Sequence, residues 1–171
     1  FQVTNAEIAA GGEVDITTLA DGSFVLAYEM QNGAGTEIAF QQISSDFSSL
    51  GTQVTVDATD GSVGTRVESL SDGGFALSWA NGGNVQARLY GSDGNPETAA
   101  LTLGAGMQPS ITALTGGGFL AAYTQPGCDG HLCGVTAQVF DSAGTAVNDP
   151  FIVNQLIEGH QHTPFAVTRA N

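Results

Sequence analysis

The sequence predicts an all-β protein built from repeated four-stranded antiparallel units that resemble the blades of a β-propeller. One pattern returns three times, at residues 16–28, 67–79 and 111–123, with spacings of 51 and 44 residues between copies. Each period holds four short segments of alternating apolar and polar residues, and no segment has a helical period. Three such units also fit a β-trefoil or a β-prism, but a four-strand meander without a barrel and cap division favours blades.

Each copy of the pattern predicts a β-hairpin. Asp-Gly or Gly-Gly stands between two apolar runs, and Gly22, Gly73 and Gly117 supply the positive φ that primed turns need. The strand after the turn carries two aromatic residues four positions apart, on one face of the strand. These pairs are Phe24 and Tyr28, Phe75 and Trp79, and Phe119 and Tyr123. A sugar-stacking platform is one interpretation, but equivalent aromatics in a repeat favour a buried core.

The whole chain, residues 1–171, is predicted to form one repeat domain. The repeats run approximately over residues 14–64, 65–108 and 109–163. Residues 1–5 resemble the last strand of a unit, and residues 164–171 resemble the first. Unmatched strands at both ends expose unpaired backbone groups, so we expect a protein partner, either identical chains or the remainder of a longer chain.

The composition points to an acidic, exported protein. Three arginines and no lysine stand against 17 acidic residues, giving a formal net charge of −14. Such a surface repels nucleic acid and anionic membranes, which leaves cations, neutral sugars and protein as partners. No apolar run is long enough to span a bilayer, no signal peptide is visible, and the first residue is not Met. We therefore expect a processed chain that is secreted or held at the cell surface.

The two cysteines lie in a short glycine-flanked stretch where the other copies merely turn. A disulfide between Cys128 and Cys133 would fasten this hairpin loop, and it requires an oxidising compartment. A zinc site is the competing interpretation, but it needs two further ligands, and only His131 lies nearby in the sequence.

The repeats resemble those of a known class of proteins. The pattern Asp-Gly-Gly-Phe, then Gly-Val-x-Ala-Gln-x-Phe-Asp and Phe-x-Val-Asn, is clearest over residues 109–154. It resembles β-repeats in large secreted bacterial RTX-like surface proteins and adhesins, which implies a role in adhesion, scaffolding or a matrix. The Gly-Gly-x-Gly-x-Asp nonapeptide that binds calcium in RTX proteins is absent, so a calcium site is not implied by the resemblance.

Candidate ligand sites in the sequence are weak. Asp57, Asp60 and Asp93 could supply oxygen ligands to calcium, although the same residue types serve turns. His160 and His162 share one face if extended, but they lie in a loop between repeats, where solvation is the simpler interpretation. No other cofactor is indicated.

The sequence contains no recognisable catalytic constellation. There is no nucleophile beside a base, no obvious acid pair, and no phosphate-binding loop before a helix. We therefore predict a non-catalytic secreted module with a structural, self-assembly or adhesive role. Carbohydrate binding, in pockets lined by polar residues such as Gln86 and Gln138, is the alternative, and a hydrolytic enzyme comes third.

Overall fold

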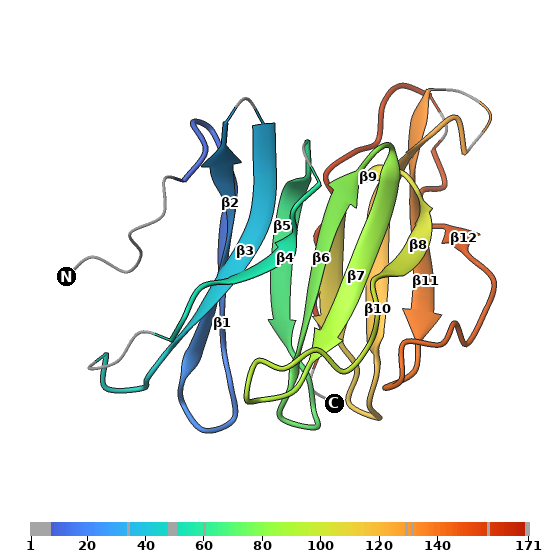
Figure 1. The fold of residues 1–171 in the computed structure, drawn as a ribbon. Coiled ribbons are helices and arrows are strands. Elements are labelled where there is room, and N and C mark those ends of the chain that lie inside the picture. Colours follow the sequence, from blue (N-terminus) through green and yellow to red (C-terminus); the bar gives the residue numbers. More distant parts are fainter. Residues whose placement is uncertain are drawn as a thin grey trace.

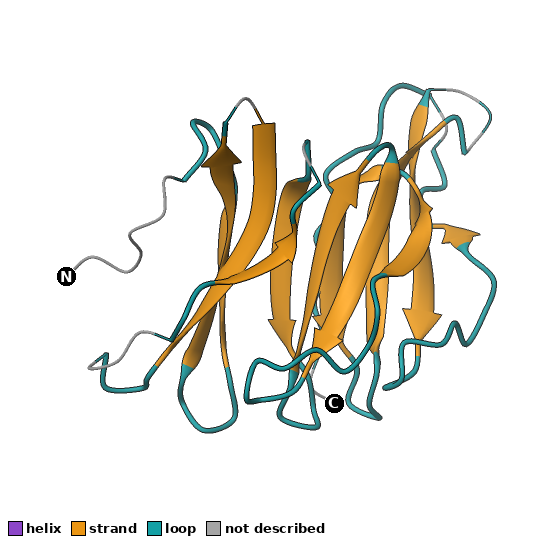
Figure 2. Ribbon diagram, viewed as in Figure 1, coloured by secondary structure: helices purple, strands orange, loops and turns teal. Residues whose placement is uncertain are grey.

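The computed structural model describes residues 8–33, 35–47, 51–59, 61–128, 130, 132–156 and 158–169. These residues form three four-stranded antiparallel sheets and no helix, which confirms the predicted all-β architecture of propeller-like blades (Figures 1 and 2). None of the described residues belongs to a helix that could cross a membrane.

Each sheet is a meander whose strands pair in chain order. The first sheet contains β1 (Val14–Thr18), β2 (Phe24–Asn32), β3 (Gly35–Ile43) and β4 (Val54–Asp57). The second contains β5 (Val63–Ser69), β6 (Phe75–Asn81), β7 (Asn84–Tyr90) and β8 (Leu101–Ala105). The third contains β9 (Met107–Ala113), β10 (Phe119–Pro126), β11 (Cys133–Phe140) and β12 (Phe151–Ile152).

The hairpin after each first strand differs from the predicted turn type. In the first sheet the Gly22 N–H donates to the Leu19 carbonyl at 2.9 Å, and the Leu19 N–H donates to the Ser23 carbonyl at 2.8 Å. Of the three loop residues, only Gly22 has a positive φ, of 83°. This is a three-residue loop, a type I turn followed by a left-handed glycine, rather than a two-residue primed turn. The same geometry recurs around Gly73 and Gly117, with φ of 95° and 90°.

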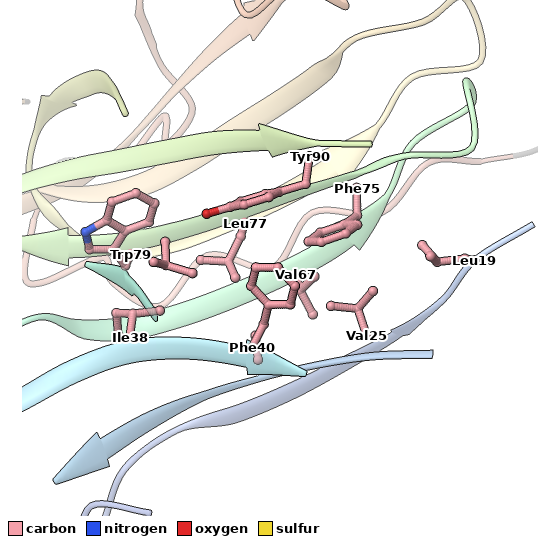
Figure 3. Close-up of a cluster of buried hydrophobic side chains, with 11 residues drawn as sticks. Leu19, Val25, Ile38, Phe40, Val67, Phe75, Leu77, Trp79 and Tyr90 are labelled. Carbon is pink, nitrogen blue, oxygen red and sulfur yellow. The ribbon is translucent and has the colours of Figure 1, made fainter. Parts of the chain in front are cut away.

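The sheets pack face to face, and an apolar layer fills each of the two interfaces. Between the first and second sheets, Phe40 packs edge-on against Phe75 at 5.1 Å between ring centroids, and Phe75 stacks on Tyr90 at 5.0 Å. Figure 3 shows Ile38 and Phe40 of the first sheet pointing toward the side chains of the second. The layer consists of Leu19, Val25, Ala27, Ile38, Phe40, Val56, Val67, Phe75, Leu77, Trp79 and Tyr90.

A second apolar layer lies between the second and third sheets. It consists of Leu70, Ala76, Val85, Ala87, Leu89, Leu103, Ile111, Phe119, Ala121, Tyr123 and Phe140. Phe119 stacks on Phe140 at 4.9 Å. Of the six aromatics in the repeat pattern, five are buried, and the sixth, Phe24, is half-buried and stacks on Phe47. Five of the six aromatic residues are therefore core side chains, and the repeat does not form an exposed sugar platform.

The sequence predicts a partial strand at each end of the repeats. The strand expected at residues 1–5 lies outside the described residues. The described part of the other, residues 164–169, forms no strand, but it lies beside β9 through side-chain hydrogen bonds. Phe165 and Val167 in this segment are 85% and 71% exposed. The expectation that another protein covers these side chains stays a prediction.

Candidate functional site

The first strand of each sheet lies beside the first strand of the next. β1 contacts β5, β5 contacts β9, and residues 164–168 continue the series beyond β9. No backbone ladder joins these strands, because each belongs to a different sheet. Side chains make the connection instead, and the repeat places equivalent residues at each step.

We call β1, β5 and β9, the first strands of the three sheets, the inner strands. Side chains at two repeat positions on them accept hydrogen bonds from the backbone of the next member of the series. The Asp15 carboxylate accepts from the Val67 N–H at 2.9 Å, and the Ser110 hydroxyl accepts from the Ala166 N–H at the equivalent place, also at 2.9 Å. Two residues further on, the Thr17 hydroxyl accepts from the Ser69 N–H at 3.2 Å. Polar side chains thus hold successive blades in register along the inner edge.

The middle strand, β5, carries charged residues at both of these positions. Glu68 stands where the flanking strands have Thr17 and Thr112, and it accepts a long hydrogen bond, of 3.4 Å, from the Ala113 N–H. Arg66 stands where they have Asp15 and Ser110, and a guanidinium cannot accept a hydrogen bond. A short neutral side chain would satisfy the structural requirement at either place, so this pair of charges calls for another explanation.

Arg66 turns back toward the first sheet. Its Nη1 donates to the Glu13 carboxylate and, at 2.7 Å, to the Thr65 carbonyl. The Arg66 side chain remains 29% exposed and that of Glu13 45% exposed. The guanidinium is therefore held by the Glu13 carboxylate, and Arg66 borders the same cavity as Asp15 and Glu68.

The inner strands border an open cavity of about 390 Å³. This volume is within the range of pockets that bind small molecules. Both polar and apolar side chains contribute to its lining. The lining consists of Asp15, Ile16, Arg66, Val67, Glu68, Ser110, Ile111, Thr112, Phe165, Ala166, Val167 and Thr168.

The environment of Glu68 changes its acidity. Burial raises the pKa of Glu68 above its ordinary value, and the negative charge of Asp15 raises it further. Hydrogen bonds from the Ala113 N–H and the Thr112 side chain act in the opposite direction but do not cancel the rise. Asp15, by contrast, accepts backbone N–H bonds on both carboxylate oxygens, at 3.0 and 2.9 Å. Two carboxyl groups with different hydrogen-bond partners therefore border one cavity.

The calcium candidates have other partners. Asp57 accepts hydrogen bonds from the Trp79 indole at 2.7 Å, the Ser62 hydroxyl at 3.0 Å and the Thr59 N–H at 2.9 Å. Burial would raise the pKa of Asp57, but these hydrogen bonds outweigh it and hold the pKa below its ordinary value. Asp93 bonds the backbone and side-chain nitrogens of Asn95, as a turn residue does.

Asp60 lies outside the described residues, and elsewhere the described chain brings together no group of three or more metal-ligating side chains. His160 and His162 are exposed, as expected of a solvated loop. Gln138 donates to the Asn148 carbonyl at 2.7 Å, and neither it nor Gln86 lines the cavity.

The structure does not contain the predicted disulfide. Cys128 and Cys133 are free, half-buried thiols. The register of the hairpin explains this, because the residue opposite Cys133 is Pro126, while Cys128 lies two positions further into the loop. His131, the candidate zinc ligand, lies outside the described residues.

The sequence prediction missed Asp15, Arg66 and Glu68. An alignment of the three copies would have singled out Glu68, because the other two copies have threonine, Thr17 and Thr112, at the same repeat position. Nothing in the sequence alone showed that this position faces a cavity.

Comparison with known proteins gives likeness only at the level of the fold. No family model matches the chain, and no curated protein matches it in sequence. Solved structures do match. The xyloglucan PUL GH43B protein of Bacteroides ovatus is 16% identical with a TM-score of 0.55, over 82% of this chain and 28% of that protein. An endo-arabinase from Bacteroides thetaiotaomicron is 14% identical with a TM-score of 0.53, over 83% of this chain and 61% of the enzyme.

A glycosyl hydrolase from Bacteroides ovatus is a further match, 13% identical with a TM-score of 0.51, over 84% of this chain and 52% of that one. The chain thus spans between 28% and 61% of the length of these three proteins. At this identity the matches establish a shared β-propeller-type fold.

The comparisons overturn two predictions. The resemblance to RTX-like surface proteins and adhesins is wrong, because the solved structures that match this chain include a GH43 protein, an endo-arabinase and a glycosyl hydrolase. The prediction of a non-catalytic structural, self-assembly or adhesive module fails for the same reason. The short repeat motif that suggested adhesins encodes hairpins and a core, and those features are common to propeller blades of any function.

Proposed function

We propose that this protein is carbohydrate-active and that the cavity along its inner strands binds an oligosaccharide and hydrolyses a glycosidic bond. The observation that carries the proposal is the placement of Glu68 and Asp15, from neighbouring blades, in one cavity. The shared fold with glycoside hydrolases supports it, including the endo-arabinase and the xyloglucan PUL protein. The lysine-free acidic composition is consistent with a secreted location for such an activity.

The cavity offers the two kinds of surface that a sugar ring requires. Hydroxyl groups of Ser110 and Thr112 and the charged residues can exchange hydrogen bonds with sugar hydroxyls. Apolar side chains such as Ile16, which is 54% exposed, can cover the C–H faces of the ring. A neutral polar ligand of this kind suits a protein whose net charge is −14.

The chemistry follows from the two carboxyl groups. In the proposed step Glu68, whose pKa is raised by burial, acts as the acid and donates a proton to the glycosidic oxygen as the bond between that oxygen and the anomeric carbon breaks. A water molecule adds its oxygen to the anomeric carbon, and Asp15 acts as the base that receives the proton lost by the water. One water is consumed and one new hemiacetal end is formed, so the step is a balanced hydrolysis.

The test is an assay of binding and of reducing-end release on neutral oligosaccharides, including xyloglucan fragments and arabino-oligosaccharides. We expect Glu68→Gln to bind the best of them with an affinity within about threefold of the parent protein, and to cleave it at least about 100-fold more slowly, because the acid is lost. Glu97→Gln is the matched control, since Glu97 is exposed on a turn and does not line the cavity. Cleavage by Glu68→Gln at the parental rate, or no binding of any oligosaccharide, would refute the proposal.

A further inference from the structure

The charges around the cavity determine which sugars it can accept. Arg66 is the one cationic side chain in its lining. An exposed arginine in a sugar pocket ordinarily indicates a carboxylate or sulfate ligand, because its planar fork binds such groups through two parallel hydrogen bonds. In this cavity the surroundings of Arg66 argue the opposite.

The guanidinium is already neutralised by the protein. Nη1 donates both to Glu13 and to the Thr65 carbonyl, so the end-on fork that Nη1 and Nη2 would form is not free. Two further carboxyl groups, of Asp15 and Glu68, line the same cavity. With Glu68 as the proposed acid, the acidic groups of Glu13 and Asp15 still outnumber the single guanidinium, and an anionic sugar would meet net repulsion.

The placement of Glu13 makes the repulsion of anionic sugars a property of the site and not of the overall surface charge alone. Glu13 immediately precedes β1 in the first sheet, whereas Arg66 lies in β5 of the second, so their ion pair crosses the inner edge between blades. The Glu13 side chain is 45% exposed and does not line the cavity, and its contact is with Arg66. The Glu13 carboxylate thus affects a bound ligand through its contact with Arg66.

Building on the proposed function, we infer that the cavity selects uncharged saccharides and rejects uronic acids, and that the Glu13 to Arg66 ion pair sets this selectivity. Arg66 then serves to donate hydrogen bonds to neutral hydroxyl groups and to lower the mutual repulsion of the carboxylates. Glu13 is a positioning residue, because it fixes the guanidinium without reaching the ligand.

The experiment compares the neutral oligosaccharide that binds best with its counterpart in which free primary hydroxyl groups are oxidised to carboxylates, by calorimetry at low ionic strength. The two ligands differ by one carboxylate at each oxidised ring. We expect the uronate to bind at least about fivefold more weakly, the factor that one like-charge contact at about 4 Å gives in water. Raising the salt concentration should narrow this difference, since salt screens exposed charges.

Glu13→Gln should free the arginine and remove one negative charge, so the ratio of uronate to neutral affinity should rise by about fivefold or more. Glu97→Gln removes the same charge away from the cavity and should leave the ratio unchanged. Equal affinity of the parent protein for both ligands, or an unchanged ratio in Glu13→Gln, would overturn the inference while leaving the proposed function intact. Failure to bind either ligand would overturn the proposed function itself.

Discussion

The contact between Trp79 and Asp57 permits a sharp prediction about how the blades hold together. Trp79 is 1% exposed in β6 of the second sheet, and its indole N–H donates to Asp57 at the end of β4 in the first. Trp79→Ala would remove a fully buried large side chain at a cost of about 3 to 5 kcal/mol, a large share of the stability of an ordinary domain. Trp79→Phe is more informative, because it retains an aromatic ring and removes the donor.

For Trp79→Phe we expect the free energy of unfolding to fall by about 1.5 to 3 kcal/mol, the usual contribution of a hydrogen bond to a charged group. Urea unfolding followed by far-ultraviolet circular dichroism measures it, since Trp79 is the one tryptophan and fluorescence is lost in the variant. Phe75→Leu, in the same core layer, is a control that reduces an aromatic side chain without touching Asp57.

The pH dependence separates the hydrogen bond from packing. Because the folded-state pKa of Asp57 lies below its ordinary value of 3.8, its contribution is present above that pH and is lost as the pH falls through the folded-state pKa. Trp79→Phe should weaken this acid-dependent loss, and Phe75→Leu should leave it unchanged. A Trp79→Phe protein with parental stability and an unchanged acid slope would refute the reasoning.

Three further predictions concern the turns, the cavity and the cysteines. Gly118→Ala should lower the free energy of unfolding, measured in urea, by about 1 to 3 kcal/mol, because Gly118 has a φ of 78° and the added Cβ would lie 2.2 Å from the Phe140 carbonyl oxygen. Gly116→Ala, in the same turn, is the control: its Cβ meets no atom within 4 Å, and the stability should not change. Because the pKa of Glu68 is raised in the folded state, the stabilising contribution of the protonated side chain is full below pH 4.5 and declines as the pH rises through the folded-state pKa. The free energy of unfolding of Glu68→Gln should therefore fall less between pH 4 and 7 than that of the parent protein. The same pH dependence in both proteins would contradict this prediction. Thiol titration of denatured, unreduced protein should find both cysteines free, and a titre of zero would restore the disulfide.

The hairpins and the core were readable from the sequence because local patterns encode them. Alternation over a strand decides which residues share a face, and a glycine at a fixed offset decides where the chain turns. Phe75 and Trp79 could therefore be placed on one face from their spacing and assigned to the core from their recurrence in the repeat, and both are buried. The turn type was misread because one glycine with a positive φ serves both a primed turn and a type I turn with a left-handed residue after it.

The cavity could not be predicted in the same way. Asp15 and Glu68 are 53 residues apart, and no local pattern relates one first strand to the next. They come together because an apolar layer fixes the second sheet against the first, which sets β5 beside β1. The sequence by itself determined the repeated four-stranded unit, since that unit depends on short-range periodicity. Only the packing of whole sheets decided that charged residues from different units meet in one cavity, because side-chain contacts between sheets, and not backbone pairing, align the inner strands.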